Sequence, residues 1–340
     1  MNHPTRRART AACLLLTGVL LLLPGCDRPG PSAGGDAFGA GDTQVASADP
    51  SGQAQAPVDL TPLLQPAGKY LGVALDGAPA SMEPVQKYAE MVGKQPNIIE
   101  NYAGWGDQFD STGVRLSWQN GALPYIAWEP HKTPLADITK GDSDPYIKAF
   151  ATAVQKTNVP VAISFAHEMN GHWYDWGTKT NSAEDFVAAW RRIHDIFQDR
   201  GASNVIWVWS PNIVNPVQQV ALQPYYPGDG YIDWVGMVGY WTECCDKDFE
   251  QLYGPTMAQV RKFSGKPFII SETAAEPGKK ASSFVDQLFA GVEEHPDVLG
   301  FVWFNISKRA DWRLEKTPSS LKAFKQHAAD PRYGFDPRKP

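Results

Sequence analysis

Short apolar runs rich in β-forming residues recur along this 340-residue chain, at intervals wide enough for one helix and two loops. Eight runs are expected to be strands: residues 70–76, 97–102, 123–128, 159–166, 204–209, 232–240, 266–271 and 298–304. Amphipathic stretches predict helices over residues 82–92, 144–157, 183–200, 249–263, 282–294 and 317–327. This alternation predicts an α/β fold with parallel strands and right-handed crossovers. Eight units favour closure into a single (β/α)8 TIM barrel.

An open, doubly wound sheet is the competing architecture. Such a sheet usually carries a glycine-rich turn after its first strand. Residues 75–79 read Leu-Asp-Gly-Ala-Pro and lack that fingerprint. Residues 213–230 are rich in proline and glycine and predict at most a short helix between the fifth and sixth strands.

The first 60 residues are predicted to lie outside the barrel domain. Arginines precede an apolar segment at 11–23, which indicates a signal peptide over residues 1–25. Its end resembles a bacterial lipoprotein processing box with lipid on Cys26, although an ordinary cleaved signal is the alternative. Residues 26–60 contain few large apolar side chains and predict a flexible tether. We therefore expect a (β/α)8 domain over 61–340 on a membrane-anchored lipoprotein of the bacterial cell envelope, or alternatively a secreted protein.

Charge and cysteine content narrow the possible partners. Without residues 1–25 the chain has 28 basic and 37 acidic side chains, a formal net charge of −9. Nucleic acid is excluded as an expected partner because its binding requires a basic face. With Cys13 in the signal and Cys26 at the lipid site, only Cys244 and Cys245 remain in the mature fold. These neighbours could form a vicinal disulfide or stay as two thiols.

Two predicted strands end in a glutamate set among polar and aromatic residues. The run at 159–166 leads into His167 and Glu168, and the run at 266–271 leads into Glu272. The side chains expected at strand ends are Asp76, Glu100, Trp105, Trp128, Glu129, His167, Glu168, Trp209, Asn212, Tyr240, Trp241, Glu272, Trp303 and Asn305. The fourth and seventh strands of a barrel face one another across its axis. Glu168 and Glu272 could therefore form the carboxyl pair that retaining glycoside hydrolysis requires.

The tryptophan content supports a sugar ligand. The chain has 12 tryptophans, and several fall at strand ends, where aromatic rings can stack on the apolar face of a sugar. Trp190 and Trp207 are instead interpreted as packing residues. His167 and His172 are five positions apart, about 140° round a helix, and so do not match the zinc motif with histidines four apart. No Gly-x-Ser-x-Gly occurs, and neither a metal nor another cofactor is expected.

The residues around both glutamates resemble a known family. The segment from His167-Glu168-Met169-Asn170-Gly171-His172-Trp173 through Trp176-Gly177 resembles the acid/base signature of glycoside hydrolase family 26. Ile270-Ser271-Glu272-Thr273 resembles that family's nucleophile strand, and the similarity covers about residues 68–315. The resemblance implies that Glu168 is the acid/base and Glu272 the nucleophile of a retaining (β/α)8 glycosidase.

The same resemblance suggests roles for further side chains. His167 would contact the sugar at the cleaved bond, and Trp173 would line the cleft. Tyr240 would hydrogen-bond the nucleophile, Trp303 would be an aromatic platform, and Trp128 would be a further aromatic contact. Asp311-Trp312-Arg313 is similar to the family's segment after the eighth strand, without an assigned role.

The resemblance implies a retaining endo-β-glycosidase that cuts a β-linked polysaccharide. We expect a monomer that needs no cofactor. An endo-β-1,4-mannanase is the first expectation. Residues 105–109 and 241–245 depart from mannanase sequence, so a β-1,3-1,4-glucanase or a β-1,3-xylanase stays open. A non-catalytic polysaccharide-binding lipoprotein is the alternative from another class, although such a protein would not need an acid opposite a nucleophile.

Overall fold

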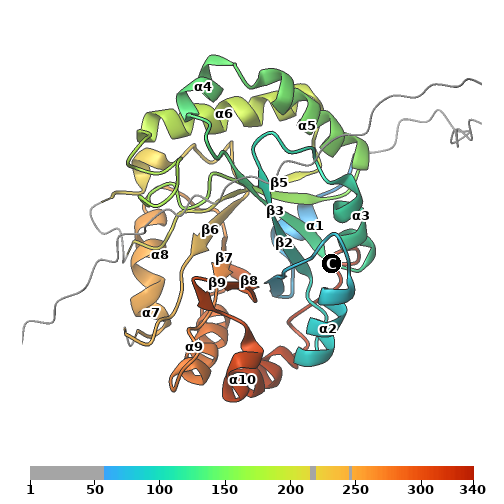
Figure 1. Ribbon diagram of the computed structural model, residues 1–340, viewed down its shortest axis with the longest axis vertical. Helices are drawn as coiled ribbons and strands as arrows, with labels where there is room; N and C mark the ends of the chain where they lie inside the picture. Colours follow the sequence, from blue (N-terminus) through green and yellow to red (C-terminus); the bar gives the residue numbers. More distant parts are fainter. Residues whose placement is uncertain (1–56, 215–219, 245–246) are drawn as a thin grey trace, which may run out of the picture. The chain divides into compact units, whose positions relative to one another are not determined.

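The computed structural model describes residues 57–214, 220–244 and 247–340. Eight parallel strands pair in chain order, and β8 pairs with β1 to close a barrel (Figure 1). They are β1 (Tyr70–Ala74), β2 (Ile98–Gly104), β3 (Leu123–Glu129), β4 (Val161–Phe165), β5 (Val205–Trp209), β6 (Trp234–Val238), β7 (Phe268–Thr273) and β8 (Val298–Phe304). The predicted single (β/α)8 barrel is confirmed, because each strand overlaps one of the predicted apolar runs.

Helices surround the barrel (Figure 1). They are α1 (Thr61–Leu64), α2 (Glu83–Val92), α3 (Ser111–Gln119), α4 (Leu135–Lys140), α5 (Asp144–Thr157), α6 (Ala183–Asp199), α7 (Phe249–Leu252), α8 (Gly254–Val260), α9 (Ala281–Glu294) and α10 (Pro318–Ala328), with short 3-10 turns at Gln223–Tyr225 and Leu314–Lys316. The longest, α6, begins with a capping box in which Ser182 and Asp185 satisfy each other's backbone N–H groups. Its apolar stripe faces the barrel, as the spacing of Phe186, Trp190 and Ile193 predicts.

Four helical details differ from the sequence expectation. The short helices α1, α3 and α4 were not predicted, and α3 contains Gly113 and β-branched residues that weaken its helical signal. The Asp110 carboxylate accepts a hydrogen bond from Gly113 N–H and so helps to fix the start of α3. The helix predicted over 249–263 is divided into α7 and α8, because Pro255 has no backbone N–H and begins a new helix.

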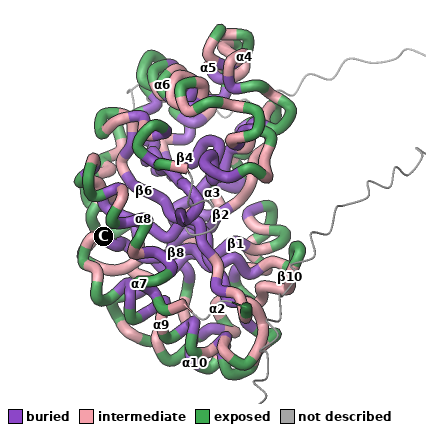
Figure 2. The backbone as a smooth tube through the Cα atoms, turned by 90° about the vertical axis from the view of Figure 1, so that its left-hand side faces the viewer, coloured by how far each residue is buried: buried purple, intermediate pink, exposed green. Residues whose placement is uncertain are grey.

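Burial follows the layers of the barrel. Figure 2 shows buried residues along the strands and exposed residues on the outer faces of the surrounding helices. Every residue of β1, β4, β5, β6, β7 and β8 is buried, as expected for parallel strands covered by helices. Because all strands are parallel, their carboxyl ends meet at one rim, and that rim holds both predicted catalytic glutamates.

A small antiparallel hairpin follows β8 at this rim. It consists of β9 (Ser307–Lys308) and β10 (Ala310–Asp311), with Arg309 at the turn in a left-handed conformation, φ 60°. Trp312 then donates from its backbone N–H to Ile306 and from its indole Nε1 to the Lys308 carbonyl, both at 3.1 Å. The hairpin therefore has a fixed position beside the end of β8.

The predicted signal peptide, Cys26 and most of the predicted tether lie outside the described residues, as does Cys245 of the vicinal cysteine pair. Those predictions stay untested. Within the described ranges, no helix is long and apolar enough to cross a membrane.

Candidate active site

A cavity of about 350 Å³ opens at the rim formed by the carboxyl ends of the strands. Its lining combines two carboxyl groups, two cations and a wall of aromatic rings: Tyr102, Glu168, Trp173, Tyr174, Tyr240, Thr242, Glu272, Phe304, Lys308, Arg309 and Trp312. Glu168 and Glu272 come from opposite strands and face the same cavity, as the sequence predicts. Trp173 and Tyr240, both predicted site residues, lie there too.

Glu272 lies in β7 and accepts hydrogen bonds on both carboxylate oxygens. The Tyr102 hydroxyl donates to Oε2 and the Tyr240 hydroxyl donates to Oε1. Burial raises the pKa of Glu272, while these two phenols and the nearby Lys308 ammonium act in the opposite direction by stabilising the anion. Two donors fix the carboxylate plane, which suits a group that must attack along one direction. Tyr240 therefore makes the contact that the resemblance implies.

Glu168 lies three residues beyond β4 in a left-handed backbone conformation, φ 55°. Such conformations cost about 1–3 kcal/mol for a residue with a side chain and cluster at functional sites. The surroundings hold it there: its N–H donates to the Ser210 carbonyl at 2.7 Å, and its carbonyl accepts from Gly171 at 2.8 Å. Its carboxyl group accepts from Asn212 Nδ2 and, at 2.9 Å, from Trp173 Nε1.

The two glutamates differ in their proton affinity. Burial and the neighbouring Glu272 carboxyl raise the pKa of Glu168 to about 7, so Glu168 holds its proton near neutral pH. Two phenol donors support the charged form of Glu272 instead. The surroundings thus favour a protonated Glu168, while the two phenols favour the ionised form of Glu272 across the same cavity.

Reciprocal amide contacts position Glu168. Asn170 Nδ2 donates to the Asn212 carbonyl, and the Asn212 N–H donates to Asn170 Oδ1, both at 2.9 Å. Trp176 Nε1 donates to the His167 carbonyl at 2.7 Å. The segment after β4 is therefore joined to the segment after β5, and the amide of Asn212 is set against the Glu168 carboxyl.

His167 lies behind the cavity rather than in its lining. Its ring is buried, with Nε2 3.4 Å from the Tyr174 hydroxyl and 4.0 Å from a Glu129 carboxyl oxygen. Burial lowers the pKa of His167 to about 3, so the imidazole is neutral at physiological pH. The predicted sugar contact is not made by this arrangement. His167 instead supports Tyr174, whose ring does line the cavity.

Two predicted aromatic contacts, Trp303 and Trp128, are wrong in position. Trp303 in β8 is 1% exposed and packs edge-on against Phe324 of α10, with ring centroids 5.6 Å apart. Side chains alternate along a strand, so the next residue, Phe304, lines the cavity instead. Trp128 in β3 is fully buried and stacks on Phe150 of α5 at 4.3 Å. Neither tryptophan lines this cavity.

The aromatic wall contains rings to which the sequence assigned no role. They are Tyr102 at the end of β2, Tyr174 after β4, Phe304 at the end of β8, and Trp312 after the β9–β10 hairpin. The Trp312 ring packs against Tyr240, with centroids 4.8 Å apart. The motif Asp311-Trp312-Arg313 therefore has a place in the site that the sequence alone did not assign.

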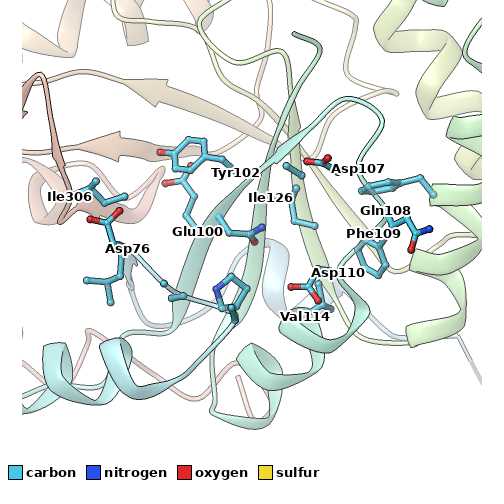
Figure 3. A pocket seen from close by; sticks show the side chains of 18 residues that line it. Asp76, Glu100, Tyr102, Asp107, Gln108, Phe109, Asp110, Val114, Ile126 and Ile306 are labelled. Carbon is cyan, nitrogen blue, oxygen red and sulfur yellow. The ribbon is translucent and has the colours of Figure 1, made fainter. Parts of the chain in front are cut away.

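A second cavity of about 420 Å³ lies between the segment after β1, the end of β2 and the segment before α3 (Figure 3). Tyr102 lines both cavities. Glu100 and Tyr102 lie on the same side of β2, and burial together with the nearby Glu272 raises the pKa of Glu100 well above its ordinary value. Burial of Glu100 therefore disfavours a second negative charge beneath Glu272.

Removing one phenol donor should raise the pKa of Glu272. Tyr240→Phe or Tyr102→Phe deletes a hydrogen bond to the carboxylate, which is worth about 1.5–3 kcal/mol, or roughly one to two pKa units. We expect the acidic limb of the kcat/KM–pH profile to move upward by that amount. The matched control is Tyr88→Phe, which deletes the buried hydroxyl of a tyrosine whose ring packs against Phe324 of α10. If the acidic limb stays in place in both Tyr240→Phe and Tyr102→Phe, the assigned role of the two phenols is contradicted.

The two tryptophans near the end of the chain should respond in opposite ways. Trp303→Ala empties a buried site and should cost about 3–5 kcal/mol in the free energy of unfolding. Trp312→Ala should change the free energy of unfolding far less, yet lower kcat/KM by about tenfold or more, because a cavity ring is lost. Urea unfolding and steady-state kinetics on both variants measure this. If Trp303→Ala instead lowers kcat/KM and Trp312→Ala lowers the free energy of unfolding, Trp303 would be the aromatic platform for the sugar.

In the described part of the chain, no group of three or more His, Cys, Asp or Glu side chains is arranged to hold a metal ion. The site that is present is a closed (β/α)8 barrel with two buried carboxyl groups facing one aromatic cavity at the carboxyl ends of the strands. This is the arrangement that defines the barrel glycosidases as a class.

Comparison with known proteins agrees with this class. The model for Glycosyl hydrolase family 26 matches residues 144–280, a segment that contains both Glu168 and Glu272. Endoglucanase H of Acetivibrio thermocellus is 28% identical over 264 residues, which cover 74% of this chain but only 29% of that protein. A mannan endo-1,4-beta-mannosidase of Bacillus subtilis is 27% identical over 268 residues, covering 66% of this chain and 70% of that protein.

A solved family 26 β-mannanase from Bacteroides ovatus has the same fold. It superposes with a TM-score of 0.62 at 19% identity, covering 81% of this chain and 92% of that structure. Over the segment that carries both glutamates, the chain is therefore similar to glycosyl hydrolase family 26.

Proposed function

We propose that this protein is a retaining endo-β-glycosidase, with β-1,4-mannan as its first candidate substrate. The observation that carries the proposal is the pairing of an acid and an anion in one aromatic cavity. Glu168 has a pKa raised to about 7, and Glu272 accepts two phenol hydrogen bonds opposite it. A polysaccharide-binding protein without turnover would have no use for this division of proton affinity.

The geometry supports a double displacement. In the first step a Glu272 oxygen attacks the anomeric carbon while Glu168 gives its proton to the leaving glycosidic oxygen, forming a covalent glycosyl–enzyme ester. Glu168, now ionised, then takes a proton from water, and that water breaks the ester at the same carbon. Glu272 leaves as a carboxylate, Glu168 is protonated again, and the configuration at the anomeric carbon is retained.

Trp173, Tyr174, Phe304 and Trp312 supply apolar faces on which sugar rings can stack. The Trp173 indole also donates to Glu168, so a sugar packed on this ring lies against the acid. Mannan is favoured among β-linked polymers because the B. subtilis relative, which shares most of its length with this chain, is named as a mannan endo-1,4-beta-mannosidase. Mixed-linkage glucan and β-1,3-xylan are the alternative substrates.

We place this activity at the bacterial cell envelope. The support is the sequence of residues 1–26, which predicts a lipidated Cys26 after a cleaved signal. Expression of the full chain with radiolabelled or alkyne-tagged fatty acid would test it. Label should be incorporated by the natural sequence and lost in Cys26→Ala. Equal labelling of both would contradict the anchor without affecting the hydrolase proposal.

A panel of polymers tests the activity itself. Purified residues 57–340 should release reducing ends from at least one of β-mannan, glucomannan, barley glucan and β-1,3-xylan, with a mixture of oligosaccharides as early products. A protein that binds one of these polymers but cleaves none of them would support the non-catalytic alternative and contradict the proposal.

A further inference from the structure

We infer that the natural substrate is a β-linked glycan that carries acidic units as well as neutral ones, with a carboxylate-bearing sugar bound beside the scissile bond by Lys308 and Arg309. The inference rests on the proposed glycosidase function and specifies its substrate class. It begins from an unexpected feature of the cavity. Two adjacent cations line it together with the catalytic carboxyl groups, although a neutral mannan or glucan offers no charge for them to bind.

Lys308 and Arg309 are exposed on the edge of the β9–β10 hairpin, and among the described residues neither one forms a salt bridge. The Lys308 charge acts only at longer range, on the Glu272 and Glu129 carboxyl groups. The hairpin does contain an acid, Asp311. However, Asp311 is already engaged by Arg313 at 2.6 Å and by Lys316 at 3.3 Å. The pairing within this segment is therefore complete without the two cavity cations.

The hairpin presents these cations at a defined place. Lys308 pairs with Ala310 across the turn, and Arg309 occupies the turn with φ 60°. The Trp312 indole donates to the Lys308 carbonyl at 3.1 Å, so the cationic residue is held by the ring that also walls the cavity. The Lys308 ammonium lies 5.9 Å from the centre of the Tyr102 ring, close to the phenol that donates to Glu272.

Catalysis alone accounts for only one of the two charges. Lys308 stabilises the Glu272 anion, which is useful for a nucleophile. The Arg309 guanidinium acts on the Tyr174 phenol, on the wall formed by the segment after β4. Arg309 thus faces the space that a substrate would fill. Elsewhere the mature chain is acidic, so without a local cationic site an acidic polymer would be repelled.

The chemistry of the two side chains indicates the ligand. A guanidinium matches a carboxylate in a planar, two-point hydrogen-bonded pair, and an ammonium beside it adds a point charge. A uronic acid unit presents such a carboxylate on C5 of its ring, at the edge of the sugar face that stacks on aromatic side chains. Trp312 supplies that face directly beside the two cations.

Binding to an inactive enzyme tests this inference without requiring turnover. In a Glu168→Gln background, calorimetric titration would compare mannohexaose with the same oligosaccharide oxidised at C6 to uronate. We expect the oxidised ligand to bind about tenfold more tightly at low salt, and the preference to shrink in 0.5 M NaCl. Arg309→Gln and Lys308→Gln should each reduce the preference about fivefold, since each removes one exposed charge pair.

Arg200→Gln is the matched control. Arg200 is exposed and lies after α6, at the opposite end of the barrel, so the preference for the oxidised ligand should be unchanged in this variant. Equal or tighter binding of neutral mannohexaose would overturn the inference, as would a preference that survives in the Lys308→Gln/Arg309→Gln double variant. Failure of the wild-type protein to hydrolyse any polymer would instead count against the proposed function, because binding is measured independently.

Discussion

Replacing Glu272 with alanine is expected to lower kcat on the preferred polysaccharide by about 10⁴-fold or more, because the covalent route is lost with the nucleophile. KM should change much less, since the aromatic wall and the hydrogen-bonded segment around Glu168 remain. Initial rates of reducing-end release measure the effect. Glu294→Gln, an exposed glutamate at the end of α9, is the control and should retain full activity.

A small anion should rescue this variant in a way that identifies the role of Glu272. Azide can enter the space left by the carboxylate and attack the anomeric carbon of an activated aryl glycoside. The product should be a glycosyl azide of inverted configuration, formed at a rate that rises with azide concentration. Loss of activity without any azide product would indicate that Glu272 is structural rather than the nucleophile.

Glu168→Gln should lower kcat on polysaccharide by about 10²- to 10⁴-fold, the range expected for removing a general acid. The loss should be much smaller for the first step on a substrate with a good leaving group, such as a dinitrophenyl glycoside, which departs without protonation. A burst of dinitrophenol followed by slow turnover is the expected time course, because Glu168 is still needed to activate water. Equal losses on both substrates would contradict the acid/base assignment.

The pH profile gives a further signature of Glu168. Its pKa is raised to about 7, and the acid must be protonated for the first step, so kcat/KM should fall as pH rises through about 7. Glu168→Gln cannot lose a proton and should abolish this alkaline limb. The acidic limb belongs to Glu272 and should persist in that variant. A profile of unchanged shape would assign the alkaline limb to another group.

Much of this fold could be predicted from the sequence because buried parallel strands leave a simple trace. All eight strands overlap predicted apolar runs, and β8 coincides with the predicted residues 298–304. Helix signals were weaker where local residues disfavour a helix and tertiary packing decides the outcome. Helix α3, with Gly113 near its start and Asp110 as its cap, is the clearest example.

The site was predictable to the extent that it follows strand ends. Glu168 and Glu272 lie at the carboxyl ends of opposite strands, and that position in a barrel is read directly from the order of the strands. The aromatic contacts were harder to predict from the sequence, because a shift of one position along a strand decides whether a ring faces the cavity or the helices. Trp303 and Phe304 are neighbours in β8, yet Trp303 is buried against a helix while Phe304 lines the cavity. Trp312 reaches the cavity through a hairpin whose shape had no sequence signal.

Glu272 attacks the anomeric carbon while Glu168 gives its proton to the glycosidic oxygen that leaves. The most direct test of these two roles is incubation with a 2-deoxy-2-fluoro glycosyl fluoride of the preferred sugar, followed by intact-protein mass and peptide mapping. The account predicts a mass increase of one fluorosugar per chain, located on the peptide that contains Glu272 and absent in Glu272→Ala. Labelling of another residue, or no labelling by a reagent whose parent sugar the enzyme hydrolyses, would contradict it.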